Sequence, residues 1–344
     1  MPSNRRARSG FALPAVLAVT GVVTLVFLVA ITALSSLTAE AAATRARLRF
    51  MERALSIEAE VSFMLATEPL TNSGVAVGAP RLQGSIETNV APAAALGPTS
   101  LVRLDGRLYQ ADIRGPIALR LQDQAGMLNL ANLGEAQTIR LGELMGLSPG
   151  DARALRFKVM DYTDQDDLRR LNGAESADYG FRIPNRPMLR PTEWLSLLDV
   201  REAIDPPLWR KYRPDLAADF TLASVNVNTA TSQTLQVLYD LNEAQAASAI
   251  RAREATPFLT LNDFAAASGA SVIDDFERIY TFPSGRVVYV ISDPNSAWVY
   301  RARLTLTPGG LEQPVWIDQT ELTQAPRRAV ANIIDAARLP YPAR

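Results

Sequence analysis

The chain has 344 residues, of which 48% are hydrophobic, and its formal net charge is −1. This near balance excludes a general electrostatic attraction to nucleic acid or to anionic lipid. The sequence contains neither cysteine nor histidine, so disulfide bonds, thiolate chemistry and the usual general base at neutral pH are excluded. A metal site in this chain must therefore use oxygen ligands, which favours calcium or magnesium.

The first 34 residues predict a basic leader followed by a membrane span. Residues 1–10 are polar and basic, whereas residues 11–34 carry no charge. A helix of about 20 apolar residues crosses a bilayer, and basic residues in front of it favour a cytoplasmic N-terminus. Two other interpretations remain open here, a plain membrane anchor and a secretory signal cut near Ala39-Glu40-Ala41. The apolar run is longer than the roughly 7–15 residues of a secretory signal, which argues against the second.

The span is predicted to continue without a break as an amphipathic helix. No Gly or Pro occurs between Arg45 and Ala66, and apolar residues recur at steps of three and four, as on one face of a helix. We therefore expect a single helix of about 55 residues, or roughly 80 Å at 1.5 Å per residue. Residues 11–34 form its transmembrane half, and residues 35–66 form its amphipathic half, which docks on a globular domain. The predicted buried stripe consists of Phe50, Ala54, Ile57, Val61 and Met64.

This layout resembles that of type IV pilins and of the pseudopilins of type II secretion, whose leader ends in Gly and precedes an apolar residue. Here Arg8-Ser9-Gly10 is followed by Phe11-Ala12-Leu13. The resemblance implies that a prepilin peptidase removes residues 1–10 by cleavage between Gly10 and Phe11, and that the new N-terminus is methylated. Pro14 agrees with this, because it then lies in the first turn, whose N–H groups have no helical partner. In an uncut helix the same Pro costs about 3 kcal/mol.

The fifth residue of the mature chain departs from the family pattern. Most pilin-like subunits carry Glu there, and the resemblance assigns it to meeting the amino terminus of the subunit assembled just before. This chain has Ala15. A lone carboxylate in the bilayer costs about 2.5 kcal/mol or more, so it is expected only where it has a partner. A subunit that begins the fibre has no predecessor, and Ala15 therefore suits a position at the tip.

The rest of the chain predicts strands, then a helical block, then strands again. Strand patterns occupy 101–104, 108–113 and 117–121, and return at 286–291, 297–306 and 315–321, while helical signals run from about 136 to 275. The expected fold is α+β, with a pilin-like N-terminal helix packed on an antiparallel sheet and a sterile-alpha-motif-like or helix-hairpin-helix-like domain inserted between strands. The predicted parts are a first sheet segment (67–131), the inserted α-domain (132–280), a second sheet segment (281–325) and a C-terminal tail helix (326–344).

Several separated motifs resemble those of the K minor pseudopilin family, general secretion pathway protein K. Family members commonly have tryptophan where Tyr162 stands here, and the other motifs follow the family order. The resemblance implies a non-enzymatic subunit of the pseudopilus. The motifs are Leu121–Leu130, Asp161–Asp167, Asn172–Glu175 with Tyr179, Asn185–Pro187, Glu193–Leu195 and Val225–Ala230.

An acidic segment within these motifs is a candidate metal site. Calcium takes six to eight oxygen ligands, and family members bind calcium in this region, so the resemblance implies a calcium site here. The segment lacks the Gly spacing of an EF-hand loop. The alternative is a solvated acidic loop neutralised by Arg169 and Arg170. The candidate ligands are Asp161, Asp164, Asp166, Asp167, Glu175 and Asp178.

Residues 226–264 also resemble the helix-hairpin-helix module of competence DNA receptors. That module binds phosphate through the backbone N–H groups of a Gly-rich hairpin. The hairpin position here, Leu238–Glu243, has two acids and no Gly. We therefore expect a shared fold without nucleic-acid binding. The matching residues are Asn228-Thr229-Ala230, Ala244-Gln245-Ala246, Ile250, Arg253 and Pro257-Phe258.

The expected function is that of a minor pseudopilin at the tip of the type II secretion pseudopilus, which nucleates the fibre and takes part in protein export. The expected partners are other minor pseudopilins, the major pseudopilin, the prepilin peptidase and exported proteins. The expected location is the bacterial inner membrane, with one span and a periplasmic globular domain. The alternatives are a type IV pilus minor pilin, a membrane-anchored DNA-binding module and a membrane-tethered metal hydrolase, the last disfavoured by the lack of histidine.

Overall fold

The computed structural model describes residues 12–78, 100–219, 222, 225–272, 279–307, 313–324, 333 and 336–340. The predicted cleavage residues Gly10 and Phe11, and residues 79–99 of the predicted first sheet segment, lie outside these residues. The chain divides into two compact units, Met1–Leu55 and Ser56–Arg344, and each is described by itself.

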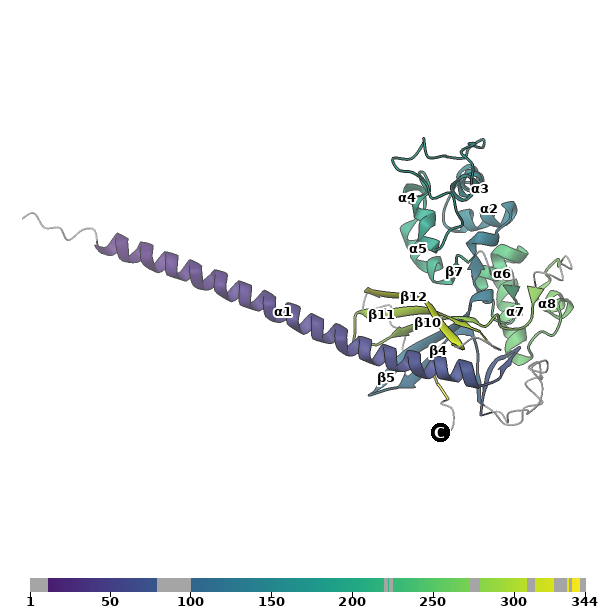
Figure 1. Ribbon diagram of the computed structural model, residues 1–344, viewed down its shortest axis with the longest axis horizontal. Helices are drawn as coiled ribbons and strands as arrows, with labels where there is room; N and C mark the ends of the chain where they lie inside the picture. Colours follow the sequence, from purple (N-terminus) through teal and green to yellow (C-terminus); the bar gives the residue numbers. More distant parts are fainter. Residues whose placement is uncertain are drawn as a thin grey trace, which may run out of the picture. The chain divides into compact units, whose positions relative to one another are not determined.

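A single helix, α1, runs from Ala12 to Thr67 over 56 residues (Figure 1). Its part from Leu13 onward is long and apolar enough to cross a membrane, with a mean hydropathy of 2.6 in its most apolar window. Large apolar side chains from Leu13 to Leu37 are exposed, as a lipid-facing segment requires. Both the uninterrupted helix and its predicted stripe are confirmed, since Phe50, Ala54, Ile57, Val61 and Met64 are at most 2% exposed.

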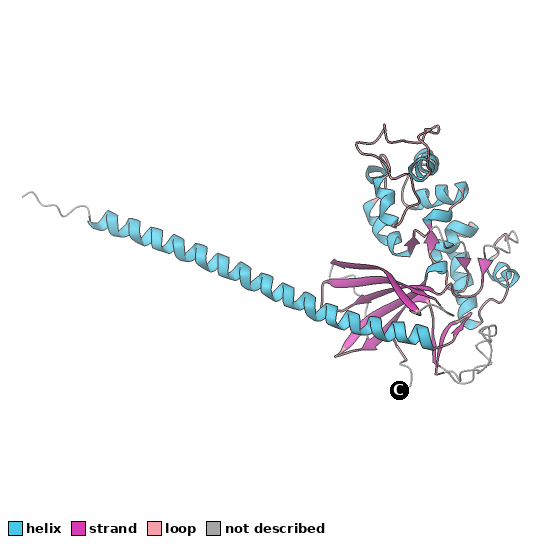
Figure 2. Ribbon diagram, in the orientation of Figure 1, coloured by secondary structure: helices cyan, strands magenta, loops and turns pink. Residues whose placement is uncertain are grey.

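The second unit contains a large β-sheet, whose strands are drawn in magenta in Figure 2. It has six strands in the order β12-β11-β10-β5-β4-β13. All neighbouring strands are antiparallel except β13 and β4, which are parallel, so the predicted antiparallel sheet is in fact mixed. The strands are β4 Asp105–Asp112, β5 Pro116–Asp123, β10 Arg286–Ser292, β11 Trp298–Leu306, β12 Val315–Gln324 and β13 Ala337–Arg338.

Two predictions about the sheet are wrong where the structure describes them. The tail helix predicted for 326–344 is contradicted at Ala337–Arg338, because these residues extend to pair with Tyr109 and Gln110 of β4. The first predicted strand, 101–104, is confirmed as a strand at residues 101–102, but it is not part of the large sheet. Instead β3 (Ser100–Val102) joins β2 (Gly74–Val77), which pairs with β1 (Leu70–Thr71), in a separate small sheet.

A helical domain lies between β5 and β10 in the sequence, although these two strands are hydrogen-bonded neighbours. Two apolar cores hold it together, the first around the buried Trp194 and the second around the buried Phe264. Short parallel pairs, β6 (Leu128–Asn129) with β7 (Leu216–Ala217) and β8 (Val225–Asn226) with β9 (Ile279–Tyr280), brace its segments. Its helices are α2 Glu135–Leu144, α3 Pro149–Thr163, α4 Val200–Ala203, α5 Pro206–Tyr212, α6 Ser232–Tyr239, α7 Glu243–Ala255 and α8 Leu261–Ser268.

A buried carboxylate joins the sheet to this domain. Asp123 ends β5 with 0% exposure and accepts hydrogen bonds from Asn226 Nδ2 at 3.0 Å, Thr229 Oγ1 at 2.9 Å and Ser284 Oγ at 2.6 Å. Burial raises the pKa of Asp123, while these donors oppose the rise. A buried charge is tolerated only when its oxygens are hydrogen-bonded. Asp123 therefore fixes both the entry and the exit of the inserted domain.

Candidate metal centre

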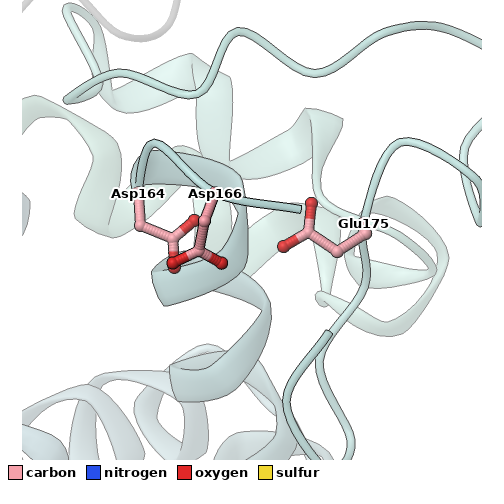
Figure 3. A group of neighbouring side chains, drawn as sticks. All are labelled: Asp164, Asp166 and Glu175. Atoms are coloured by element: carbon pink, nitrogen blue, oxygen red, sulfur yellow. The ribbon is translucent and has the colours of Figure 1, made fainter. Parts of the chain in front are cut away.

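Helix α3 and the long loop that follows it hold the acidic segment. Ser148 caps the N-terminus of α3 with Pro149 at its first position, and Asp164 is the C-cap residue. The chain has no further helix or strand until a 3-10 turn at Pro191–Ser196. Three acids of this segment converge (Figure 3): the carboxylates of Asp164, Asp166 and Glu175 each offer an oxygen within 4.8 Å of the others.

The convergence leaves buried oxygens without hydrogen-bond partners. Glu175 is 4% exposed, and within the described residues neither of its carboxylate oxygens has a hydrogen-bond donor, nor does Oδ1 of Asp164. Burial raises the pKa of Glu175, and the neighbouring Asp161, Asp164 and Asp167 raise it further. An unpaired buried carboxylate is costly. A cation with oxygen ligands would remove that cost, so the residues present fit a metal ion.

The other predicted ligands have other contacts. Asp161 is fully buried, and its Oδ1 accepts from Arg170 Nη1 at 2.6 Å while its Oδ2 accepts from Arg170 N at 3.1 Å. Arg170 also contacts Asp164 Oδ2. Asp178 pairs with Arg169 at 3.0 Å and accepts from the backbone N of Glu175 at 2.9 Å. The predicted neutralisation by arginine thus applies to Asp161, Asp178 and one oxygen of Asp164, but Glu175 has no arginine partner among the described residues.

Sequence reasoning gave Asn185 no role at this site. Its backbone is left-handed, with φ of 44°, and its Nδ2 donates to the backbone oxygen of Asp166 at 3.4 Å and to Asp167 Oδ1 at 3.5 Å. Its Oδ1 is buried without a partner among the described residues. An amide oxygen beside converging carboxylates is a further candidate ligand. The only available sequence signal was the place of Asn185 in a family motif.

The helix-hairpin-helix segment has no phosphate cradle in its turn. Between α6 and α7, Asp240 is left-handed with φ of 57°, a conformation in which Gly is usual. The side chain of Asn242 caps α7 by accepting from Gln245 N at 2.9 Å, and Gln245 Oε1 accepts from Asn242 N at 3.0 Å. Glu243 adds a negative charge to the same turn. Two backbone N–H groups at the N-terminus of α7 are therefore satisfied by the chain's own side chains.

Comparisons with known proteins agree on one family. Residues 225–279 match the family model for the type II secretion system (T2SS), protein K. The chain is 26% identical over 171 residues to the type II secretion system protein K of Pseudomonas aeruginosa, an alignment that covers 45% of this chain and 50% of that protein. The chain thus matches about half the length of this curated relative.

The fold is similar to a solved structure, the crystal structure of the GspK-GspI-GspJ complex from the enterotoxigenic Escherichia coli type 2 secretion system. The TM-score is 0.52 at 16% sequence identity, over 82% of this chain and 99% of the matched chain. Residues 225–279 and the 171-residue alignment are therefore similar in sequence to the type II secretion system protein K family, and the solved structure shows that the fold is similar as well.

Proposed function

We propose that the chain is a minor pseudopilin at the tip of the type II secretion pseudopilus. One observation carries this: a helical domain is inserted between hydrogen-bonded neighbours of a sheet, in a chain whose residues 12–67 form one long helix. A fibre interior must pack subunits on every side, whereas the end of a fibre has room for such an insertion. The similar solved structure is a complex of three proteins. We infer that this chain likewise has two partners, one that corresponds to GspI and one that corresponds to GspJ.

The same proposal places the chain in the inner membrane with one span and a periplasmic globular part. The apolar part of α1 supports the span, and Ala15 supports a terminal position, because no preceding subunit offers an amino terminus for a carboxylate at this place. A prepilin peptidase would process the chain, and the major pseudopilin and exported proteins would contact it. Its role is structural rather than catalytic.

We further propose that Asp164, Asp166 and Glu175, assisted by Asn185, hold calcium. The support is the set of partnerless buried oxygens on Glu175 and Asp164. Bound calcium supplies positive charge and flexible oxygen coordination. The residues of this chain then do the rest: Arg170 and Asp161 fix the end of α3, and Asp178 holds the backbone at Glu175.

The test is made in the organism of origin. A strain without this chain should lose type II export of its substrates to the medium, and the full-length chain should restore export. The full-length protein co-expressed with the two counterpart minor pseudopilins should purify as one complex in detergent. Normal export combined with a loss of surface pili would show a type IV pilus subunit instead. A complex that never forms, despite correct expression, would contradict the tip assignment.

A further inference from the structure

A cleft of about 160 Å³ lies between the inserted domain and the main sheet. Residues 189–192 and the segment after α5 form one wall, and residues 301–303 of β11 with 319–321 of β12 form the other. The floor is apolar, because Met127, Ala217 and Val288 pack together there. A cavity of roughly 150 Å³ holds a group the size of benzene, so this cleft has room for one side chain.

Four arginines and one carboxylate line the cleft: Arg190, Arg213, Arg301 and Arg303, with Glu321. The lining carboxylate is already engaged, since Arg213 Nη2 lies 2.7 Å from Glu321 Oε1. Arg303 Nε lies 3.2 Å from Asp318, which stands outside the lining. These two guanidinium groups are therefore compensated.

The other two guanidinium groups have no carboxylate within salt-bridge distance in the part of the chain that the structure describes. Arg301 donates from both terminal nitrogens to the backbone oxygen of Pro214, at 3.3 Å each. Its cross-strand neighbour Glu321 and the nearby Asp215 offset its charge in part, but neither forms a salt bridge with it. Burial lowers the pKa of Arg301. Arg190 is exposed at the rim and makes no ion pair with a described residue. An incoming carboxylate could be held by two parallel N–H···O bonds, the geometry that arginine favours.

We propose that this cleft binds a glutamate or aspartate side chain presented by an extended acidic segment of a partner protein. The size of the cleft admits one side chain, and two of its arginines, Arg190 and Arg301, have no salt bridge within the described residues and so favour a carboxylate. Its polar wall includes Gln319 and Thr320 of β12, the last strand at that end of the described sheet. Strands at such an end carry backbone groups available to an extended peptide. The proposal does not depend on the metal site or on a position at a fibre tip.

The test uses the full-length protein in detergent and two fluorescent hexapeptides with blocked termini, one alternating glutamate with serine and the other alternating glutamine with serine. Fluorescence anisotropy should show saturable binding of the glutamate peptide, at least tenfold weaker binding of the glutamine peptide, and weakening by salt. Arg190→Glu should reduce affinity for the glutamate peptide at least tenfold. Arg190 is exposed, so this variant is expected to fold; Arg301→Gln is a second variant, checked by its melting curve.

The matched control is Arg153→Glu, which changes an exposed arginine on α3 outside the cleft lining. It should bind the glutamate peptide as the unchanged protein does. An equal loss in Arg153→Glu and Arg190→Glu would overturn the proposal, because only net charge would then matter. Equal binding of both peptides would also overturn it. So would a cleft that binds free acetate or phosphate but no peptide, since it would then be a small-anion site.

Discussion

The hydroxyl of Tyr300 donates a hydrogen bond to Oε2 of Glu58 at 2.6 Å. The same oxygen accepts from Tyr289 on the neighbouring strand. Burial raises the pKa of both tyrosines, and the hydrogen bond to Glu58 raises it further. Both hydroxyls therefore stay protonated as donors. One carboxylate near the C-terminal end of α1 thus attaches the helix to β10 and β11, within the second unit of the chain.

We expect Tyr300→Phe to destabilise the protein, because it removes one donor to a charged acceptor. Hydrogen bonds to charged groups contribute about 1.5–3 kcal/mol. The midpoint of thermal unfolding of the full-length protein in detergent should fall by several degrees. Tyr239→Phe is the control, since no hydrogen bond is found for that hydroxyl within the described residues, and its melting curve should move little. If the two variants melt alike, the bond to Glu58 adds nothing to stability.

The sequence predicted α1 well, because the repeat of apolar residues in a helix spans only three or four positions and is visible locally. The buried stripe from Phe50 to Met64 follows from that period alone. Glu58 lies off the stripe, and its partners Tyr289 and Tyr300 stand 231 and 242 residues away in the sequence. No window of sequence reveals such a pair.

The wrong prediction for the tail has a long-range origin. Residues 337–338 were assigned to a helix by local composition, but pairing with β4, more than 200 residues earlier, extends them. A strand of two residues owes its conformation to its neighbour rather than to its own propensity. At the candidate metal site, residue type identified the six acids, whereas position decided their roles. Arg170 forms a salt bridge with Asp161, and the loop places the carboxylate of Glu175 close to that of Asp164.

The N-terminus of the mature protein is predicted to be Phe11. Cleavage after Gly10 would leave Pro14 in the first helical turn, where its missing N–H costs nothing. Mass spectrometry of the protein extracted from membranes should find a chain that starts at Phe11 and carries an N-methyl group. Gly10→Val should retain the leader while leaving the span intact. An intact Met1 in the unaltered protein, or a start at Ala41 or beyond, would contradict the proposal that the chain is a pseudopilin.

Calcium is expected to raise the melting temperature of the full-length protein above that measured in chelator. Binding to the native state alone adds about 2.7 kcal/mol at a hundredfold excess over the dissociation constant. Magnesium should substitute poorly, because it requires a tight octahedral shell. Asp164→Ala should abolish the calcium response. Asp167→Asn, which changes an exposed acid outside the converging set, should keep it.

An unchanged melting curve, together with no heat in isothermal titration, would show that the acidic loop binds no ion. Loss of the response in Asp167→Asn as well would show instead that overall loop charge, rather than the Asp164, Asp166 and Glu175 set, attracts the cation.

Glu175 should make the metal-free protein less stable as the pH rises. Its pKa is raised in the folded chain, first by burial and then by Asp161, Asp164 and Asp167. The folded state therefore holds this proton more tightly than the unfolded state does. The resulting stabilisation is fully present below the ordinary Glu value of about 4.3 and is lost as the pH rises through the raised pKa.

In chelator, Glu175→Gln should consequently gain in free energy of unfolding relative to the unaltered protein between about pH 4 and pH 7, because a neutral amide never ionises. Urea unfolding of both proteins at several pH values measures this difference in free energy of unfolding. The contributions of the other buried acids are the same in both proteins and cancel. Glu143→Gln, an exposed change on α2, should leave the difference flat. In calcium the order should reverse at pH 7, since the ion stabilises the ionised Glu175 and the amide variant binds it poorly. A pH-independent difference in chelator would mean that the Glu175 carboxylate is already compensated in the folded chain.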